Sequence, residues 1–351
     1  MSHITLPVLL LLLLLPTTLS LPLPTFETWK QLYNKTYESE KEETLRRLIF
    51  EDNRQYVAEY GDKDSSLQLE LGRFADLTHE EFLGAVEVAP GRKDTRSKFG
   101  GKLFAAEMGE EGTMTCELWT PNGSAAPSSI DWKTKGAVTG ILMQTRQCPM
   151  NSYAIAALGA VTGQWYQKSG RRIAFSEQQV VDCSRRSGNF GCIYGTVGST
   201  YGYIQGNGGI ATRVNYPTTG PEGHCRTAVK LGPTVTGCRT VARGDEKAMK
   251  ELVGMVGPVT AMLDISPRSI QFYRSGVYYE KFCHSPYASH HVLVTGYGTQ
   301  YDRGLDRTVD YWLVKNSWGT GWGENGYMKI IRNYHNHCGI ANSITVPYVD
   351  K

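Results

Sequence analysis

Three short segments, far apart in the chain, each offer a side chain suited to nucleophilic catalysis. Residues 144–154 read QTRQCPMNSYA and offer a candidate nucleophile, the hydroxyl of Ser152. Residues 289–298 read SHHVLVTGYG and offer a histidine base, and residues 311–319 read YWLVKNSWG and offer an orienting amide, Asn316. A nucleophile, its base and the group that orients the base must lie within hydrogen-bond reach to act together. We therefore expect the chain to fold so that these three segments meet in one groove.

A helix is predicted directly after Ser152, because apolar residues recur there at helical spacing. They are Tyr153, Ala156, Ala157, Ala160, Val161 and Trp165. A nucleophile in the first turn lies near the positive end of the helix dipole. A cysteine there, beside a histidine, ionises to a thiolate, whereas the serine hydroxyl is far less acidic. Ser152 would therefore need a histidine to take its proton during attack, with Asn316 holding the imidazole in its orientation and tautomer.

The N-terminus predicts a secretory signal peptide over residues 1–20. Its apolar run, from Val8 to Leu15, is too short to span a bilayer, and the small polar residues Thr17, Thr18 and Ser20 follow it. Cleavage is expected near Ser20. No later segment is apolar enough to cross a membrane, so we expect a protein of the secretory pathway that does not bind membranes.

Charge and cysteine content exclude several functional classes. The net charge is only +3, which leaves no basic field large enough to suggest nucleic acid as a partner. The eight cysteines include no C-x-x-C pair, so we expect no metal site and no cofactor. Secretion makes disulfides possible, but spacing alone leaves their pairing open. The sequons at Asn34 and Asn122 are candidate glycosylation sites.

Residues 26–82 have a charged, helical pattern. One set of residues at helical spacing is Leu45, Leu48, Ile49, Asp52, Asn53 and Tyr56, and a related face holds Glu42, Arg46, Phe50, Asn53 and Val57. The second set resembles the Glu-Arg-Phe-Asn-Ile pattern in the proregion of papain-like proteases. The run FADLT at 74–78 resembles the second proregion motif, with Gly72 in place of the usual asparagine. The resemblance implies that residues 21–125 form a proregion that acts as an intramolecular inhibitor.

A linker and a mature domain are expected after this helical part. Residues 83–125 lack periodicity and are rich in Gly, Glu, Thr and Pro, which predicts a flexible, exposed linker suited to proteolytic nicking. The mature domain is predicted to start near Ala126 and to continue to Lys351. Its second half contains strand-like runs at 292–295, 312–314 and 327–331.

Residues 126–351 resemble the papain family, cathepsin L type. The runs NSWG at 316–319 and GWG at 321–323 are the most specific part of the match. The resemblance implies an α+β, papain-like two-lobed fold, with a helical lobe, a β-barrel-like lobe and an active-site cleft between them.

The resemblance also implies a role for individual residues. Gln144 matches the glutamine that donates to the oxyanion. The family's histidine lies six residues before the first glycine of the run GYG at 296–298, which selects His290 rather than His291 as the base. Successive strand side chains face opposite ways, so only one of the two can point at Ser152.

The segment around the nucleophile departs from the family pattern. The family's glutamine lies six residues before its nucleophile, whereas Gln144 and Ser152 are eight apart. The family's cysteine lies three residues before the nucleophile, and Cys148 lies four before Ser152. A rival register would place Asn151 at the nucleophile position, but the run SYAIA at 152–156 matches the family better. Two extra residues are expected to displace the oxyanion donors, and an error of about 1 Å can cost about a hundredfold in rate.

Substrate-binding residues and disulfides follow from the same resemblance. The run GCIYG at 191–195 resembles the wall that binds substrate backbone, with Gly195 in place and Tyr194 at a glycine position. Val197 matches a residue of the second specificity pocket, and Trp318 matches the aromatic cover over the asparagine. The implied disulfides are Cys148–Cys192, Cys183–Cys225 and Cys283–Cys338, with Cys116 and Cys238 unassigned.

Within the family, Ser152-Tyr153-Ala154 is similar to silicateins, which deposit silica. This resemblance predicts a Ser-His-Asn hydrolase that attacks silicon esters and condenses silicic acid to silica, secreted outside the cell or into a lysosome-like or mineralising vesicle. Two alternatives stay open. One is a catalytically inactive papain homologue that acts as a binding or matrix protein. The other is a cathepsin L-like peptidase that cleaves peptides with Ser152 or with Cys148.

Overall fold

The computed structural model describes residues 23–61, 66–86, 112–120, 125–281, 283, 289–304 and 306–351. The α-helices in these ranges are α1 (Phe26–Leu32), α2 (Glu40–Gly61), α3 (His79–Val86), α6 (Ser152–Ser169), α7 (Glu177–Cys183), α8 (Val197–Gly206), α9 (Glu246–Met255) and α10 (Arg268–Gln271). The strands are β1 (Gln68–Leu69), β2 (Glu117–Leu118), β3 (Ile130–Asp131), β4 (Thr234–Thr240), β5 (Val259–Leu263), β6 (Tyr273–Ser275), β7 (Val277–Tyr278), β8 (His290–Asp302), β9 (Arg307–Lys315), β10 (Tyr327–Ile331) and β11 (Thr345–Asp350). Short 3₁₀ helices lie at Ser184–Ser187 and His337–Gly339.

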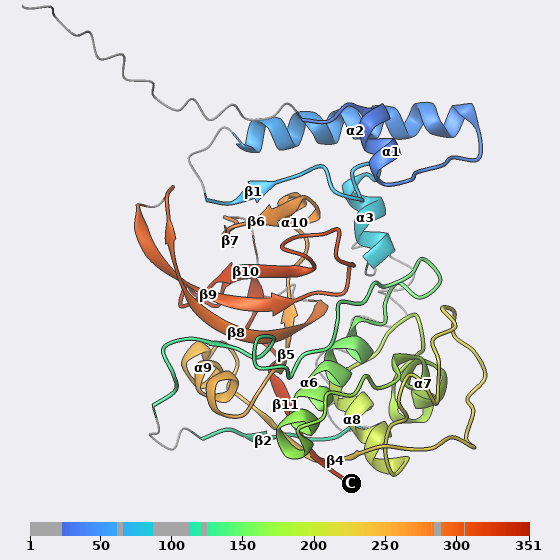
Figure 1. The fold of residues 1–351 in the computed structure, drawn as a ribbon, viewed down its shortest axis with the longest axis vertical. Coiled ribbons are helices and arrows are strands. Elements are labelled where there is room, and N and C mark those ends of the chain that lie inside the picture. Colours follow the sequence, from blue (N-terminus) through green and yellow to red (C-terminus); the bar gives the residue numbers. More distant parts are fainter. Residues whose placement is uncertain are drawn as a thin grey trace, which may run out of the picture.

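The mature part of the chain has two lobes (Figure 1). One lobe is built on a sheet with the strand order β2-β4-β11-β5-β8-β9-β10-β7, in which β3 pairs with β8. The other holds helices α6, α7 and α8, and α6 also packs against β8, β11 and β5. The two-lobed α+β fold expected from the sequence is confirmed. None of the described helices is long and apolar enough to cross a membrane.

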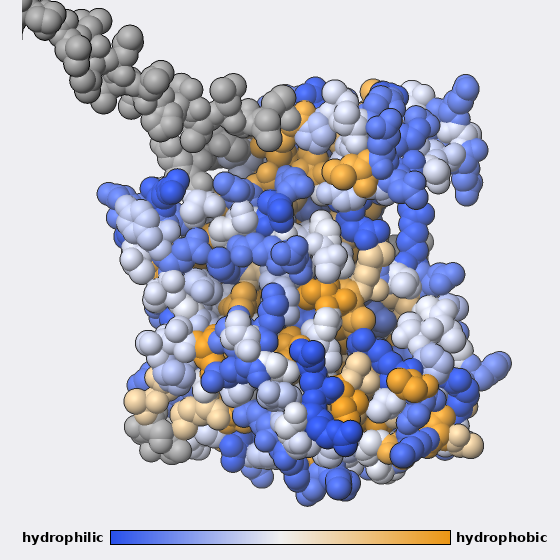
Figure 2. All heavy atoms as spheres, viewed as in Figure 1, coloured by the Kyte–Doolittle hydropathy of each residue, from blue (hydrophilic) through white to orange (hydrophobic). Residues whose placement is uncertain are grey.

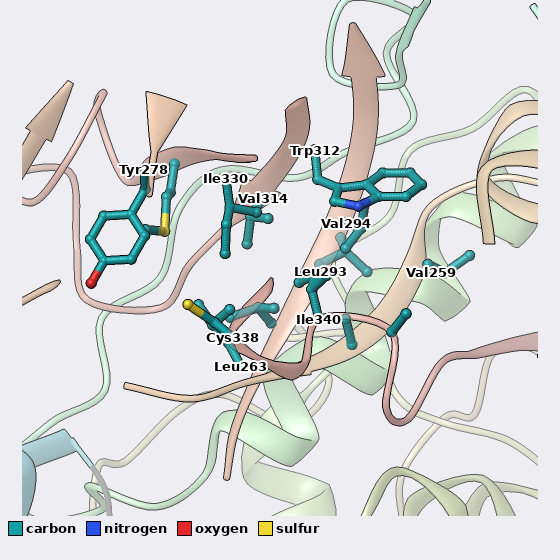
Figure 3. Close-up of a cluster of buried hydrophobic side chains, with 14 of the residues drawn as sticks. Val259, Leu263, Tyr278, Leu293, Val294, Trp312, Val314, Ile330, Cys338 and Ile340 are labelled. Atoms are coloured by element: carbon teal, nitrogen blue, oxygen red, sulfur yellow. The ribbon is translucent and has the colours of Figure 1, made fainter. Parts of the chain in front are cut away.

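Each lobe has its own hydrophobic core. The cluster under the sheet contains Val294, Trp312, Val314 and Ile330, which Figure 3 shows side by side. A second cluster lies among the helices and includes most of the buried face of α6. On β9, Trp312 and Val314 lie two positions apart and both point into this core, as the alternation of side chains along a strand allows. Because α6 contributes residues to both cores, both lobes hold the helix that begins at Ser152.

Close packing of α6 against the sheet lobe depends on two glycines. A Cβ at Gly159 would lie 2.9 Å from a methyl group of Leu293 on β8. A Cβ at Gly163 would lie 2.8 Å from the ring of Pro258. Side chains at these positions would push α6 away from the sheet. The glycines therefore fix the separation between the helix that carries Ser152 and the strand that carries His290.

The proregion helix α2 buries only one of the two faces considered in the sequence. Phe50, Asn53 and Val57 are buried, whereas Leu45 and Leu48 are exposed, Leu48 to 65%. The sequence offered both sets at helical spacing, and the structure buries the set that contains Phe50 and Val57. The Asn53 amide donates to the carbonyls of residues 75 and 77, at 2.8 and 2.9 Å. A buried amide with both donors satisfied therefore fixes α2 against the second proregion motif.

The proregion is paired with the mature domain along one edge of the sheet lobe. Strand β1 pairs antiparallel with β6. The Arg268 guanidinium donates to Asn53 and to the Asp52 carboxylate, at 2.6 Å each. Arg274 forms an ion pair with Glu70 at 2.5 Å. In Figure 1, α1 and α2 lie at one end of the molecule, and α3 leads from them toward the two lobes.

The predicted linker is partly structured. Residues 83–86 continue helix α3, and residues 117–118 form β2, which pairs parallel with β4. The expectation of a segment without regular structure therefore fails at both ends, because its backbone pairs with folded elements. Residues 1–20 and Asn122 lie outside the described residues, and the Asn34 sequon is exposed on the proregion. Figure 2 shows hydrophilic side chains over most of one face, with smaller hydrophobic patches between them.

All eight cysteines form disulfides. The structure pairs Cys148 with Cys192, Cys183 with Cys225 and Cys283 with Cys338, as the resemblance implied. The two cysteines left unassigned, Cys116 and Cys238, form the fourth bond. A disulfide-bonded sulfur is not a thiolate, so a nucleophilic role for Cys148 is excluded.

Candidate active site

Ser152 is the first residue of α6, and its side chain is nearly buried. The preceding residue, Asn151, makes no side-chain capping bond at this helix start. The N-terminal amides and the helix dipole therefore direct positive potential at the position of the serine hydroxyl. Such a position favours negative charge that develops on the nucleophile or on a bound substrate.

His290 and Asn316 form a direct pair. Nε2 of His290 lies 2.8 Å from Oδ1 of Asn316, and both side chains are buried. Oδ1 also accepts the backbone N–H of Ser317 at 2.8 Å, which identifies this amide atom as the oxygen. Because an amide oxygen only accepts, Nε2 of His290 must carry the hydrogen. The remaining nitrogen, Nδ1, is then left with the lone pair that a base requires.

Strand β8 passes beside the start of α6. The backbone N–H of His291 donates to Oγ of Ser152 at 3.4 Å. The serine hydroxyl therefore lies next to the peptide that joins the two histidines. His290 makes the contact with Asn316, so the choice of His290 over His291 matches the pairing in the structure.

Burial strongly affects the protonation of the His290 imidazole. The side chain has no exposed surface, and its ring lies 4.9 Å from that of Trp318 between centroids. Phe82 of the proregion packs edge-on against Trp318 at 5.2 Å. Burial lowers the pKa of His290 from its usual 6.5 to about 4, although the hydrogen bond to Asn316 acts in the opposite direction. The imidazole in the covered site is therefore neutral at pH 7.

We expect the free energy of unfolding of the full chain to fall as the pH is lowered from 7 to 4. An unfolded histidine binds its proton near pH 6.5, but folded His290 binds it only near pH 4, so the unfolded state binds more protons in this window. The loss from His290 alone is on the order of 3 kcal/mol. Urea unfolding at several pH values measures it. The fall should be smaller in His290→Gln than in the full chain, with the exposed His224→Gln as control, and equal falls in His290→Gln and the full chain would contradict this expectation.

Gln144 lies at the site, but its donor is occupied. Its Oε1 accepts from the hydroxyl of Ser317 at 2.7 Å. Its Nε2 donates to the backbone carbonyl of Pro149 and also faces the Val86 carbonyl of the proregion at 3.4 Å. Pro149 belongs to the lengthened loop between Gln144 and Ser152, so that loop bonds with the amide that would bind an oxyanion. This carbonyl was not identified from the sequence, because backbone atoms leave no motif.

Tyr153 packs against residues 191–195, the segment predicted to bind substrate backbone. Its hydroxyl donates to the carbonyl of Gly191 at 2.9 Å, and a Cβ at Gly195 would lie 2.4 Å from its ring. Gly195 is thus required by the packing of Tyr153. Tyr194 is half-buried, with its ring 6.4 Å from that of Phe190. Val197 starts α8 and is almost wholly buried in the core of the helical lobe.

Two family models match the chain. Residues 126–348 match the model described as papain family cysteine protease, and residues 26–82 match the cathepsin propeptide inhibitor domain (I29). Cathepsin L of Sarcophaga peregrina is 38% identical over 329 residues, which cover 92% of each chain. Cathepsin L2 of Homo sapiens is 35% identical over 326 residues, 92% of this chain and 91% of the relative.

Solved precursor structures are similar over the same length. A digestive procathepsin L 3 from the larval midgut of Tenebrio molitor has 32% identity and a TM-score of 0.74, covering 92% of this chain and 97% of that one. A recombinant stem bromelain precursor has 28% identity and a TM-score of 0.78, covering 93% and 98%. The similarity therefore includes the proregion as well as the two lobes.

Proposed function

Because the chain belongs to the papain family of cysteine proteases and carries a cathepsin-type propeptide domain, we propose that it is a secreted cathepsin L-like zymogen with a serine nucleophile. After activation it hydrolyses peptide or ester bonds with Ser152 as nucleophile and His290 as general base. Two observations carry the proposal together. The His290 imidazole is hydrogen-bonded to Asn316, and Oγ of Ser152, at the start of α6, accepts from the backbone N–H of the next residue, His291.

The proposed reaction has two steps. Nδ1 of His290 takes the hydroxyl proton of Ser152 as Oγ attacks the carbonyl carbon, and the carbonyl oxygen becomes an oxyanion near the α6 N-terminus. The intermediate then expels the leaving group, which receives the proton from His290, and an acyl-serine remains. Water attacks the acyl-serine in the same way and restores Ser152. Asn316 orients the imidazole but stabilises imidazolium less than a carboxylate would.

The proregion is proposed to keep this site closed. Phe82 covers Trp318, and the carbonyl of Val86 faces the Gln144 amide. A substrate carbonyl that used Gln144 would have to displace both Val86 and Pro149. Departure of the proregion removes the first of these contacts, and a shift of the 145–151 loop removes the second.

The silicatein resemblance extends the same proposal to a second substrate class, silicon esters. What supports it is Ser152-Tyr153-Ala154 together with a neutral imidazole. Silicon is larger and more open than an amide carbon to attack by a neutral hydroxyl. In this version a silyl-serine replaces the acyl-serine, and silicic acid or silica is the product. The relatives reported above are named cathepsin L and cathepsin L2, and the matching family model describes cysteine proteases, so peptide substrates are tested first and silica formation stays a prediction.

Substitution of Ser152 by alanine tests the proposal. We expect Ser152→Ala to remove hydrolysis of peptide and ester substrates, by a factor of at least about 10³, because nothing replaces the nucleophile. The activated domain is incubated with a fluorogenic peptide, an activated ester and an alkoxysilane. The matched control is Ser128→Ala, which removes an exposed hydroxyl near the start of the mature domain.

The outcomes separate the candidate functions. Loss of peptide or ester hydrolysis in Ser152→Ala alone supports the serine hydrolase. Loss confined to the alkoxysilane supports silicon chemistry. Activity that Ser152→Ala leaves unchanged rejects a catalytic Ser152. A protein inactive on all three substrates before substitution supports the inactive homologue that binds without catalysis.

A further inference from the structure

Residues 112–120 lie on the mature domain, although they precede it in the sequence. Strand β2 pairs parallel with β4, with Glu117 opposite Arg239 and Leu118 opposite Thr240. The backbone N–H of Trp119 adds a hydrogen bond to the carbonyl of Thr240 at 2.7 Å. Figure 1 places β2 and β4 at the end of the molecule opposite to α1 and α2. This segment is therefore an edge strand of the mature sheet.

The segment is fitted to the surface beneath it. A Cβ at Gly202 of α8 would lie 1.8 Å from the carbonyl oxygen of Gly112, so the two backbones touch. The N–H of Met114 donates to the carbonyl of Gly198 at 3.2 Å. The Arg239 guanidinium lies over the ring of Trp119, at 4.8 Å from its centroid. Backbone, apolar and cation–π contacts together stabilise the attachment.

A covalent bond joins this segment to the mature domain. Cys116 is bonded to Cys238 on β4, across 122 residues of chain. Cys238 is buried in the core of the helical lobe, and Met114 and Cys116 pack against the same cluster. The Cys116–Cys238 disulfide therefore lies inside the packed contact between residues 112–120 and the helical lobe.

The position of Cys116 in the chain gives this bond a consequence for activation. The inhibitor helices end at Val86, and the match to the protease family starts at residue 126, so Cys116 lies between the two. A single cut between Leu118 and Ala126 separates the two parts in sequence but leaves both joined through Cys116. A cut before Gly112 releases the inhibitor and leaves the segment on the mature domain.

We propose that the Cys116–Cys238 disulfide keeps residues 112–120 as a lasting part of the mature enzyme and retains the inhibitor after a cut at the start of the mature domain. A tethered inhibitor rebinds at an effective concentration on the order of 1 mM, so the cleft stays covered. Release then requires either a cut before Gly112 or reduction by a small dithiol. In the reduction, the dithiol is oxidised to its own disulfide, and Cys116 and Cys238 each gain a hydrogen. The inhibitory part of the proposal rests on the proposed function, but the covalent attachment does not.

A designed cut in the full chain tests the attachment. One variant carries the recognition sequence of a site-specific protease in place of residues 121–124, and a second carries it in place of residues 104–109. After cutting, we expect the first to run as one species without reductant and as two with it. The second should lose its N-terminal fragment without reductant. Mass spectrometry should find residues 112–120 in its retained part.

Two further experiments test the covalent attachment and the inhibition independently. In the first variant, Cys116→Ser with Cys238→Ser should release the N-terminal fragment on dilution to nanomolar concentration. If the pair of substitutions prevents folding, mass spectrometry of the unreduced digest must instead show the Cys116–Cys238 peptide. Release of the fragment from the unreduced first variant overturns the proposal. Inhibition is tested by adding Ser152→Cys to the first variant and measuring how fast the new thiol reacts after the cut. If the fragment is retained but the thiol reacts freely, the covalent attachment stands and inhibition by residues 23–86 is rejected.

Discussion

Replacing Ser152 with cysteine is expected to raise cleavage of a fluorogenic peptide by the activated domain by at least about a hundredfold, because a thiolate needs no proton transfer during attack. The position suits a thiolate, since it lies at the start of α6 beside the peptide of His290 and His291. The measurement is kcat/KM of the Ser152→Cys domain against the unsubstituted one.

The disulfides leave no native thiol that could contribute to this comparison. All eight cysteines are paired, so the new thiol is the only one in the chain. Ser128→Cys adds a thiol at an exposed position and serves as the matched control. Alkylation of the Ser152→Cys domain should abolish the gain. An unchanged kcat/KM would contradict the expectation that the groove supports catalysis. The bond between the Gln144 amide and the Pro149 carbonyl would then be the structural reason.

The lengthened loop can be tested in the same background. Removing Arg146 and Met150 places Gln144 six residues before Ser152, the spacing that the family has. If the Pro149 carbonyl then leaves the Gln144 amide, the recovered oxyanion donor should add about 10²- to 10³-fold in kcat. No further gain would mean that the loop already moves away when substrate binds.

Replacing Phe82 with alanine is expected to open the zymogen. Phe82 is fully buried, with its ring 5.2 Å from Trp318 and 5.3 Å from Phe74. Truncating a buried phenylalanine costs about 3–5 kcal/mol, and about 1.4 kcal/mol is tenfold in an equilibrium. If most of this cost falls on the closed state, the population with an open cleft should rise by about 10²-fold or more.

A thiol at position 152 reports this opening in the full chain. In the Ser152→Cys zymogen, the rate of alkylation by iodoacetamide follows the open population when opening and closing are fast. Phe82→Ala should raise that rate by about 10²-fold or more. Leu48→Ala, which truncates an exposed leucine of the same proregion, is the control. Equal rates for the two variants would show that Phe82 does not hold the proregion in place.

Local patterns predicted individual helices and strands. The run after Ser152 has the spacing of a buried helix, and α6 starts at that residue. The strand-like run at 327–331 is β10, because period-two patterns are set by neighbours in sequence. The same reasoning was weaker for α2, where two faces had helical spacing. Only the docking of residues 75–77 onto Asn53 decided which face is buried.

The comparisons place the chain with cathepsin L-type proteins, and silicon chemistry remains a prediction drawn from Ser152-Tyr153-Ala154. That run specifies which atoms stand at the nucleophile position. It does not specify which ester reaches them, because substrate choice depends on the shape of the wall. In the segment predicted to form that wall, the ring of Tyr153 fills the space over Gly195.

The sequence by itself determined the fold class and the proregion, and it predicted Ser152, His290 and Asn316 as candidate site residues, because the spacing of motifs along the chain is typical of one fold. Only the tertiary structure decided that the Pro149 carbonyl occupies the Gln144 amide and that Cys116 pairs with Cys238. The first contact uses a backbone atom, and the second joins residues 122 positions apart. Both depend on the path of the chain through space, which residue types and their spacing do not encode.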